Sequence, residues 1–318
     1  MSPKPFRFAV SSSAATSGAA WRDIARQAED LGFSTLHVSD HYVDQASNGG
    51  QMLAAIPAMA AAAAVTSTLR VGARVLCVDY HHPVVLAKSL ATLDLLSDGR
   101  LEIGLGAGWV ASEYEAMGLS MDDAPTRIAR LSDTVSFVRA FFTGEPLDVS
   151  GPFVNAQGFK GQPTPVQQPS PPLIIGGGAR KVLTYAGQVA DIVSFNFDNR
   201  AGVVGPAGVQ SSGAAAMDQK VAWMRAGAGA RADQVELEVG AYFTTVTDAP
   251  GPVAEKMGSM FGLSADDMAE HPNALIGTID DICDKLEARR ERYGFSYVTV
   301  ADRNMAAFAP VVARMAGK

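Results

Sequence analysis

Two neighbouring residues, Asp40 and His41, have the types and spacing that proton transfer requires. They directly follow an apolar run that reads as a strand, and a histidine beside a carboxylate can move a proton near neutral pH. Alternatively, Asp40 caps a turn and His41 is buried and hydrogen-bonded. His81 and His82 form a second histidine pair, but they stand at the start of a predicted helix, which favours a loop role. From the pattern alone, His41 is a candidate acid–base group that Asp40 would orient, and both interpretations stay open.

A glycine-rich strand end is the next candidate. Residues 101–109 read Leu-Glu-Ile-Gly-Leu-Gly-Ala-Gly-Trp, with glycine at alternate positions. Glycine lacks a Cβ, so a ligand or another backbone can approach it closely. The run is not a dinucleotide motif, because Trp109 stands where G-x-G-x-x-G needs its third glycine. We predict that Gly106, Ala107, Gly108 and Trp109 contact a bound cofactor; the alternative is a loosely packed corner of the fold.

A third candidate is the turn formed by Gly176, Gly177 and Gly178, which lies between an apolar strand and a predicted helix. Backbone amides at a helix N-terminus bind anions. Arg180 and Lys181 fall in the first helical turn, where cations oppose the helix dipole, so their presence there favours an anionic ligand. We predict a phosphate site at the three glycines, the alternative being a tight turn without a ligand.

Composition and missing motifs exclude several classes of protein. The chain is 47% hydrophobic and 19% charged, which suits a large core, and its net charge of −7 argues against nucleic-acid or anionic-membrane partners. Cys77 and Cys283 are the two cysteines, and no C-x-x-C, H-E-x-x-H or G-x-S-x-G motif occurs, so we expect no disulfide framework and no metal site. Residues 52–69 are apolar and alanine-rich, typical of a buried helix. We expect a cytoplasmic protein.

Strand-like and helix-like segments alternate along almost the whole chain. Eight strands, each followed by a helix, predict parallel strands with right-handed crossovers, and the number eight favours a (β/α)8 TIM barrel over an open sheet. We expect one domain over residues 1–318, with insertions near 144–171, where a short hairpin fits, and near 198–213. The predicted strands are 6–10, 34–39, 71–78, 101–105, 172–175, 191–195, 235–246 and 296–300, and the predicted helices are 19–31, 52–66, 83–96, 126–142, 179–190, 217–226, 278–293 and 305–315.

Taken together, these motifs resemble the luciferase-like monooxygenase superfamily, especially the branch that uses the deazaflavin coenzyme F420. The resemblance covers nearly the whole chain. The glycine runs alone are weak signals, but all the motifs in this order are highly specific. They are Val38-Ser-Asp-His41, Val75-Leu-Cys77, His82-Pro-Val84, Ala91–Arg100, Gly104–Trp109 with Glu113-Tyr114, Ile174–Gly178, Ala190-Asp191 and Gly277-Thr278.

The resemblance implies a luciferase-like barrel that holds a flavin or deazaflavin ring in its mouth. It also implies a non-prolyl cis peptide near Arg74 and Val75, forming a bulge behind the ring. The cofactor phosphate of relatives lies against the turn that matches Gly177 and Gly178. Asp40 and His41 match positions near the reactive edge of the ring.

One departure from the family pattern concerns Trp109. Sugar-phosphate dehydrogenases of this branch carry a glutamate proton donor there, and tryptophan cannot ionise, so glucose-6-phosphate oxidation is not expected and His41 becomes the best acid–base candidate. We predict hydride transfer between F420 and an unidentified small organic molecule, in a protein that is a homodimer by family analogy. An FMN-dependent monooxygenase and a non-catalytic flavin-binding protein are the alternatives.

Overall fold

The structure is a computed structural model that describes residues 3–43, 50–203 and 205–318. The chain divides into two compact units. Unit 1 comprises Met1–Ser12, Gln27–Thr35 and Gly176–Lys318. Unit 2 comprises Ser13–Arg26 and Leu36–Ile175.

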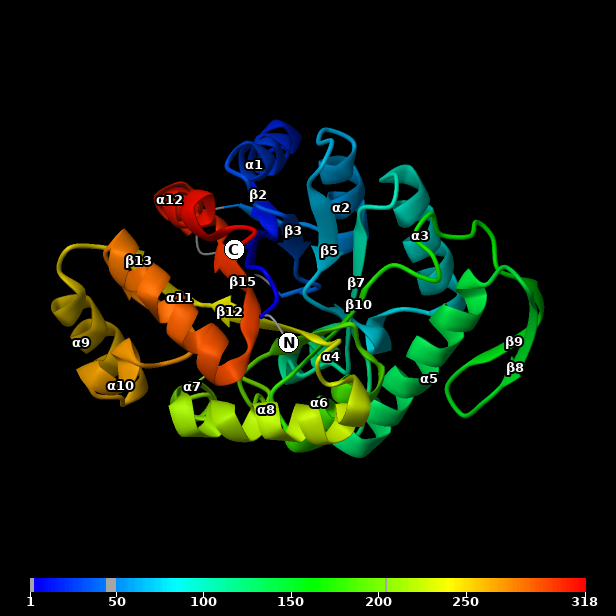
Figure 1. Cartoon of the computed structure of the whole chain (residues 1–318). Coiled ribbons are helices and arrows are strands. Elements are labelled where there is room, and N and C mark those ends of the chain that lie inside the picture. The colour runs from blue at the N-terminus through cyan, green and yellow to red at the C-terminus, as the bar shows by residue number, and fades with distance from the viewer. Residues whose placement is uncertain (1–2, 44–49, 204) are drawn as a thin grey trace. The chain divides into compact units, whose positions relative to one another are not determined.

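The main sheet has the strand order of a (β/α)8 TIM barrel, as predicted. Its order is β10-β11-β12-β15-β1-β3-β5-β7, and β10 pairs with β7 as well (Figure 1). The short strand β6 follows β5 and also pairs in parallel with β7, so β5 and β6 share the third position. The strands are β1 (Arg7–Ser11), β3 (Thr35–Val38), β5 (Arg70–Ala73), β6 (Leu76–Cys77), β7 (Leu101–Gly106), β10 (Leu173–Gly177), β11 (Ile192–Phe195), β12 (Glu236–Ala241) and β15 (Phe295–Ala301).

The helix ends follow local chemistry that the sequence displays. Pro83 opens α3, at a position where its missing N–H costs nothing. Thr278 and Asp281 form a capping box at the start of α11, and Gly294 ends that helix in the left-handed region. The helices are α1 (Gly18–Asp30), α2 (Ala55–Ala63), α3 (Pro83–Leu96), α4 (Ala111–Ala116), α5 (Ala124–Phe142), α6 (Arg180–Val189), α7 (Pro206–Gln210), α8 (Ala214–Ala228), α9 (Pro250–Phe261), α10 (Ala265–Ala269), α11 (Ile279–Tyr293) and α12 (Met305–Met315), with 3-10 turns η1 (Val78–Tyr80), η2 (Gly229–Arg231) and η3 (Asp302–Asn304).

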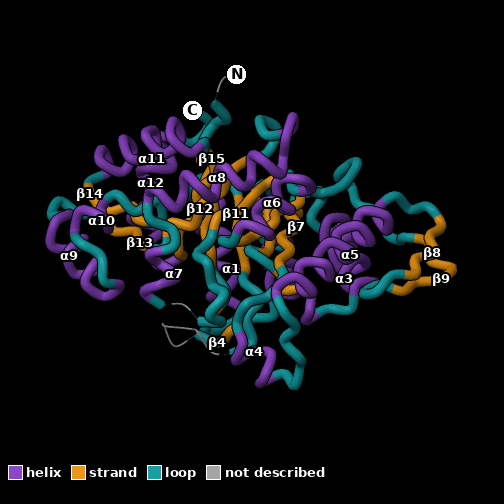
Figure 2. Tube along the Cα trace, turned by 90° about the horizontal axis from the view of Figure 1, so that it is seen from below, coloured by secondary structure: helices purple, strands orange, loops and turns teal. Residues whose placement is uncertain are grey.

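The prediction of one strand over residues 235–246 is wrong. The barrel strand β12 ends at Ala241, and β13 (Phe243–Val246) instead pairs in parallel with β14 (Ala274–Gly277) in a separate sheet. Helices α9 and α10 lie beside these strands within unit 1 (Figures 1 and 2) and complete an apolar cluster around Met268 and Ile276. Burial of this cluster explains why the chain leaves the barrel after β12.

The two predicted insertions have different structures. Residues 144–171 contain an antiparallel hairpin of β8 (Pro146–Ser150) and β9 (Asn155–Lys160), which confirms the predicted hairpin. Figures 1 and 2 both show it extending beyond α5 within unit 2. The segment 198–213 holds the short helix α7, and residue 204 lies outside the described residues. A two-residue antiparallel pair, β2 (Ala14–Ala15) with β4 (Gln51–Met52), completes the strands.

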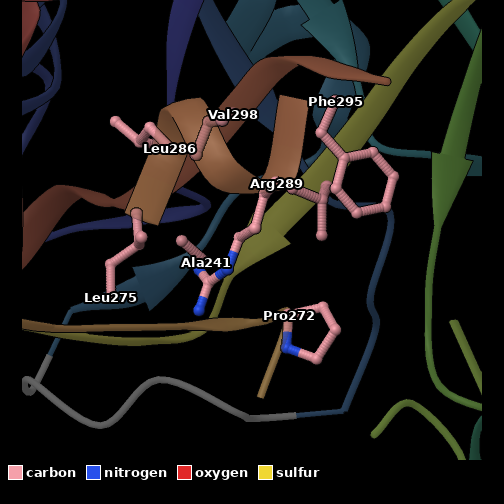
Figure 3. A pocket seen from close by; sticks show the side chains of 8 residues that line it. Ala241, Pro272, Leu275, Leu286, Arg289, Phe295 and Val298 are labelled. Atoms are coloured by element: carbon pink, nitrogen blue, oxygen red, sulfur yellow. The ribbon is translucent and has the colours of Figure 1, made fainter. Parts of the chain in front are cut away.

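A small cavity in unit 1 surrounds the buried guanidinium of Arg289. Figure 3 shows this side chain among apolar neighbours such as Leu275 and Phe295. The cavity volume is about 10 Å³, enough for roughly one water. Burial lowers the pKa of Arg289 to about 10, and its guanidinium donates to the carbonyl oxygen of His271 at 2.9 Å. This cavity is too small for an organic substrate.

Among the described residues, no helix combines the length and apolar character needed to cross a bilayer.

Candidate functional site

In unit 2, the ends of the third and fourth barrel strands are shaped by one unusual peptide bond. The Arg74–Val75 bond is cis, at the position that the family resemblance implies. A Cβ on Gly104 would lie 1.7 Å from the carbonyl oxygen of Ala73, and one on Gly106 would lie 2.5 Å from Val75 Cγ2. A missing Cβ allows either a ligand or another segment of the chain to approach closely. At Gly104 and Gly106 the structure shows the chain itself, at Ala73 and Val75, in this position. Contact of Gly106 with a cofactor stays a prediction.

At Gly108 the side chain of Tyr114 occupies the space that a Cβ would need, and contact of Gly108 with a cofactor stays a prediction. Its φ is +73°, and a Cβ there would lie 2.0 Å from the Tyr114 hydroxyl and 2.7 Å from Cys77 Sγ. The next residue, Trp109, is partly exposed and stands edge-on to the His41 ring, with centroids 6.0 Å apart. Ala107 is also partly exposed. The strand end thus presents Ala107, Trp109 and His41 as accessible groups.

His41 is oriented by Glu113. Its Nδ1 lies 3.0 Å from Glu113 Oε1, and its side chain is 20% exposed whereas that of Glu113 is 1% exposed. Glu113 Oε1 also accepts the backbone N–H of Tyr42 at 2.9 Å, and Glu113 Oε2 accepts the Tyr80 hydroxyl at 3.0 Å. A proton on Nδ1 suits this buried acceptor, and Nε2 has no hydrogen-bond partner within the described part of the chain.

The prediction that Asp40 orients His41 is therefore corrected. Asp40 is buried, and its Oδ2 accepts from His81 Nε2 at 2.8 Å and from the backbone N–H of Cys77 at 3.1 Å. Asp40 thus ties the end of the second barrel strand to the segment after the third. His81, for which the sequence favoured a loop role, is the hydrogen-bond partner of Asp40. A direct catalytic role for Asp40 stays a prediction.

Two buried side chains around this group, Cys77 and Tyr114, and the partly buried Tyr80 are held in their protonated forms. Burial raises the pKa of Cys77 to about 12 and raises the pKa values of Tyr80 and Tyr114 above that of free tyrosine. The two tyrosine rings pack edge to face, and the Tyr114 hydroxyl donates to Asp79 at 2.9 Å. A protonated thiol is a poor nucleophile, so Cys77 is not a candidate for covalent catalysis.

The glycine turn lies in unit 1, at the carboxyl end of β10. A Cβ on Gly177 would lie 2.4 Å from Val182 Cγ1, and one on Gly178 would lie 2.0 Å from the carbonyl oxygen of Phe197. Both glycines are thus required by packing, whether or not a ligand binds. The residue before α6, Ala179, provides no side-chain cap, so the first-turn amides keep their capacity to hold an anion.

A buried lysine supports the neighbouring strand end in unit 1. Lys220 Nζ donates to the carbonyl oxygen of Asn196 and to Ser212 Oγ, both at 2.6 Å. Burial lowers the pKa of Lys220 to about 8. The hydroxyl of Tyr242 donates to Asn196 Oδ1. Asn196 directly follows β11. Its position is fixed by Lys220 and Tyr242, which sequence spacing could not have linked to it.

Comparison with known proteins identifies similar sequences. A family model described as luciferase-like monooxygenase matches residues 4–250. The F420-dependent glucose-6-phosphate dehydrogenase of Amycolatopsis mediterranei (strain U-32) is 31% identical over 170 residues, covering 53% of this chain and 50% of that protein. The protein of the same name from Kribbella flavida (strain DSM 17836 / JCM 10339 / NBRC 14399) is 32% identical over 173 residues, with the same coverage. The chain spans about half the length of these curated relatives.

Solved structures share the fold over nearly the whole chain. An F420-dependent secondary alcohol dehydrogenase in complex with an F420-acetone adduct gives a TM-score of 0.77 at 17% identity, covering 96% of this chain and 98% of that one. The coenzyme F420-dependent tetrahydromethanopterin reductase from Methanopyrus kandleri gives 0.75 at 18% identity, covering 98% and 99%. At these identities the likeness establishes the (β/α)8 barrel.

Proposed function

Because the chain belongs to the luciferase-like monooxygenase family, we propose that it is an oxidoreductase that transfers a hydride between coenzyme F420 and a small organic substrate. The observation that carries the proposal is the contact of His41 Nδ1 with the buried Glu113, which leaves Nε2 of a partly exposed imidazole available for proton transfer. The F420-dependent enzymes among the similar sequences support the choice of cofactor.

The residues at the strand ends of unit 2 include aromatic side chains, which can pack against a planar ring. When bound, the deazaflavin would donate or accept the hydride. Trp109 and His41 offer partly exposed aromatic surfaces. We propose that Arg74, Val75 and the segment 106–109 hold the ring.

His41 carries the proton in this proposal. Hydride addition to a carbonyl, imine or enone leaves a negative charge on the substrate, and a protonated Nε2 quenches it; alcohol oxidation uses the same nitrogen as the base. Glu113 keeps the ring orientation fixed in both directions and stabilises the imidazolium. Tyr80, Tyr114 and Cys77 remain protonated and do not compete for this role.

Replacing Glu113 by glutamine should lower turnover about 10–100-fold, the effect usual for a group that orients a functional histidine. The amide presents either an oxygen or an NH₂ group to His41 and cannot stabilise its positive charge. Steady-state kinetics should show the loss in kcat, with little change in cofactor affinity. Glu115→Gln is the matched control, because Glu115 is an exposed residue of the same helix, α4. Equal kinetics for the two variants would contradict this role for Glu113.

We propose separately that the turn Gly176–Gly178 and the start of α6 bind the cofactor phosphate. Arg180 and Lys181 are exposed in the first turn of this helix. The double variant Arg180→Gln/Lys181→Gln should weaken F420 binding about fivefold or more, since two exposed charges near a phosphate together contribute about 1 kcal/mol. Lys256→Gln, at an exposed lysine of α9, is the control. Fluorescence titrations at low salt measure the difference. Unchanged affinity in the double variant would contradict the assignment of the phosphate to this turn.

The reaction is tested by supplying reduced F420 with a panel of enones, imines and ketones, and oxidised F420 with alcohols. The proposal expects the deazaflavin absorbance to change with at least one of these substrates and no oxygen to be consumed. Trp109 favours less polar substrates than sugar phosphates. Incorporation of an oxygen atom into a substrate, with reduced FMN and O₂ supplied, would instead establish an oxygenase. Binding without turnover of either cofactor across the panel would favour a non-catalytic protein.

A further inference from the structure

A buried lysine is linked to the glycine turn of unit 1. Lys220 lies on α8 and is only 2% exposed. Helix α8 packs against α6, which begins just after that turn (Figure 1). A Cβ on Gly187 of α6 would lie 2.2 Å from the carbonyl oxygen of Met224. One on Gly227 of α8 would lie 2.0 Å from that of Thr184. Close backbone packing therefore fixes the position of Lys220 relative to α6.

The link between the lysine and the turn runs through Asn196. The Lys220 ammonium donates to the Asn196 carbonyl oxygen at 2.6 Å, and a Cβ on Gly178 would lie 2.5 Å from that same oxygen. The backbone N–H of Asn196 donates to the carbonyl oxygen of Gly177 at 2.9 Å. Lys220 therefore holds, through one residue, the backbone that packs against both glycines.

The positive charge of Lys220 has neutral hydrogen-bond partners. Its second acceptor is Ser212 Oγ at 2.6 Å, and no carboxylate forms an ion pair with it in the part of the chain that the structure describes. Asp198 attracts the ammonium from further away, but its carboxylate accepts from the Arg200 guanidinium at 3.0 Å. A buried ammonium without a paired carboxylate costs free energy, and a bound anion would offset that cost.

The burial of Lys220 distinguishes it from the other cations near the turn. Arg180 and Lys181 are exposed, so salt in the solvent screens their attraction for an anion. A buried charge is screened much less, and charges separated by protein interact more strongly than charges separated by water. Of these three cations, Lys220 is therefore the one whose attraction for an anion should persist at physiological salt.

We propose that Lys220 is a positioning residue for the anion site at the glycine turn: its ammonium holds the turn through Asn196 and attracts the phosphate of the bound cofactor. The inference rests on the proposed function, because it takes the phosphate of F420 as the ligand. It goes beyond that function in making cofactor affinity depend on the protonation of a buried group that the ligand need not touch.

The ionisation of Lys220 gives this role a pH dependence. Burial lowers the pKa of Lys220 to about 8, and the charge of Asp198 acts in the opposite direction. The other titratable group that Lys220 influences is His271, and burial lowers the pKa of that imidazole below 6.5, so it is neutral above pH 7. The ammonium is present below pH 8 and lost above it, so F420 affinity should fall as the pH rises.

Fluorescence titration of the full chain with F420 at pH 7 and pH 9.5 tests this inference. Lys220→Met keeps an unbranched side chain without the charge. At pH 7 the variant should bind F420 about tenfold more weakly than the unmodified protein, and at pH 9.5 the two should agree within about twofold. Lys256→Met, at an exposed lysine of α9, is the control and should match the unmodified protein at both pH values.

Two outcomes of this titration would overturn the inference. Equal affinity of Lys220→Met and the unmodified protein at pH 7 would show that the charge does not act on the bound cofactor. Weakening by the same factor at pH 7 and pH 9.5 would show that Lys220 supports the fold alone. Ionisation of F420 itself affects both proteins equally and cancels in the comparison at each pH.

A second measurement uses the unmodified protein and is independent of how Lys220→Met folds. The lysine ¹³Cε resonances are followed by NMR as the pH is raised, and Lys220 should have the lowest midpoint, near pH 8. Saturation with F420 should raise that midpoint by about one pH unit, the change linked to a tenfold difference in affinity. An unchanged midpoint with F420 bound would overturn the inference and leave the proposed function standing. Failure of F420 to bind would overturn the proposed function, and this inference with it.

Discussion

Replacing His41 by alanine should lower turnover about 10²–10⁴-fold, the range expected when a positioned proton-transfer group is lost. The affinity for F420 should change little, because His41 acts on the substrate proton and is not proposed to hold the cofactor. Single-turnover measurements of deazaflavin absorbance, with the best substrate of the panel, separate the chemical step from binding. The loss should appear in the rate of that step.

His82→Ala is the matched control for this experiment. His82 is exposed just before α3, and its side chain makes no cap to that helix, so its removal should leave the single-turnover rate unchanged. Full activity in His41→Ala would place the proton donor on another residue. The family and barrel assignments would remain, because neither depends on His41.

Replacing Gly104 by alanine should reduce the free energy of unfolding by about 3 kcal/mol or more, at the upper end of overpacking effects. The added Cβ would lie 1.7 Å from the carbonyl oxygen of Ala73, a backbone atom that cannot rotate away as a side chain would. Urea denaturation followed by circular dichroism measures the loss.

Gly251→Ala provides the comparison for Gly104→Ala. A Cβ on Gly251 would meet nothing within 4 Å, and the residue lies in the first turn of α9, so this variant should match or slightly exceed the stability of the natural protein. If Gly104→Ala were as stable as Gly251→Ala, the close packing of β5 against β7 would be contradicted.

Hydrophobic patterning was sufficient to locate the barrel strands, because each is a short apolar run bounded by turn residues. The run 71–78, predicted as one strand, instead forms β5 and β6, with the cis bond between Arg74 and Val75 in the break. The run 235–246 misled because its apolar character continues past the end of β12. The break falls at Tyr242, whose hydroxyl bonds Asn196 and whose ring packs against Phe197. These contacts join segments distant in sequence, so no local pattern predicts them.

The candidate site was predicted in part. Resemblance to the family located the cis bond between Arg74 and Val75, and strand position selected His41. Adjacency suggested Asp40 as its partner, yet the Asp40 carboxylate contacts His81 instead. Glu113 is 72 residues away, and the sequence marked it through the family motif Glu113-Tyr114 that follows the glycine run, without linking it to His41.

The glycine-rich runs show a limit of sequence reasoning at such sites. A missing Cβ signals a close approach, but it does not say what approaches. At Gly104 the neighbour is the backbone of Ala73, at Gly108 it is Tyr114, and at Gly178 it is the backbone of Phe197. Side-chain packing in three dimensions decides between a ligand and the chain itself.

Cofactor titration tests the central claim most directly. Purified protein is titrated with F420 and, in a parallel experiment, with FMN, and binding is followed by the fluorescence of each cofactor. We predict saturable binding of F420 with a Kd at least about tenfold lower than that of FMN. Tighter binding of FMN, or no saturable binding of F420, would contradict it.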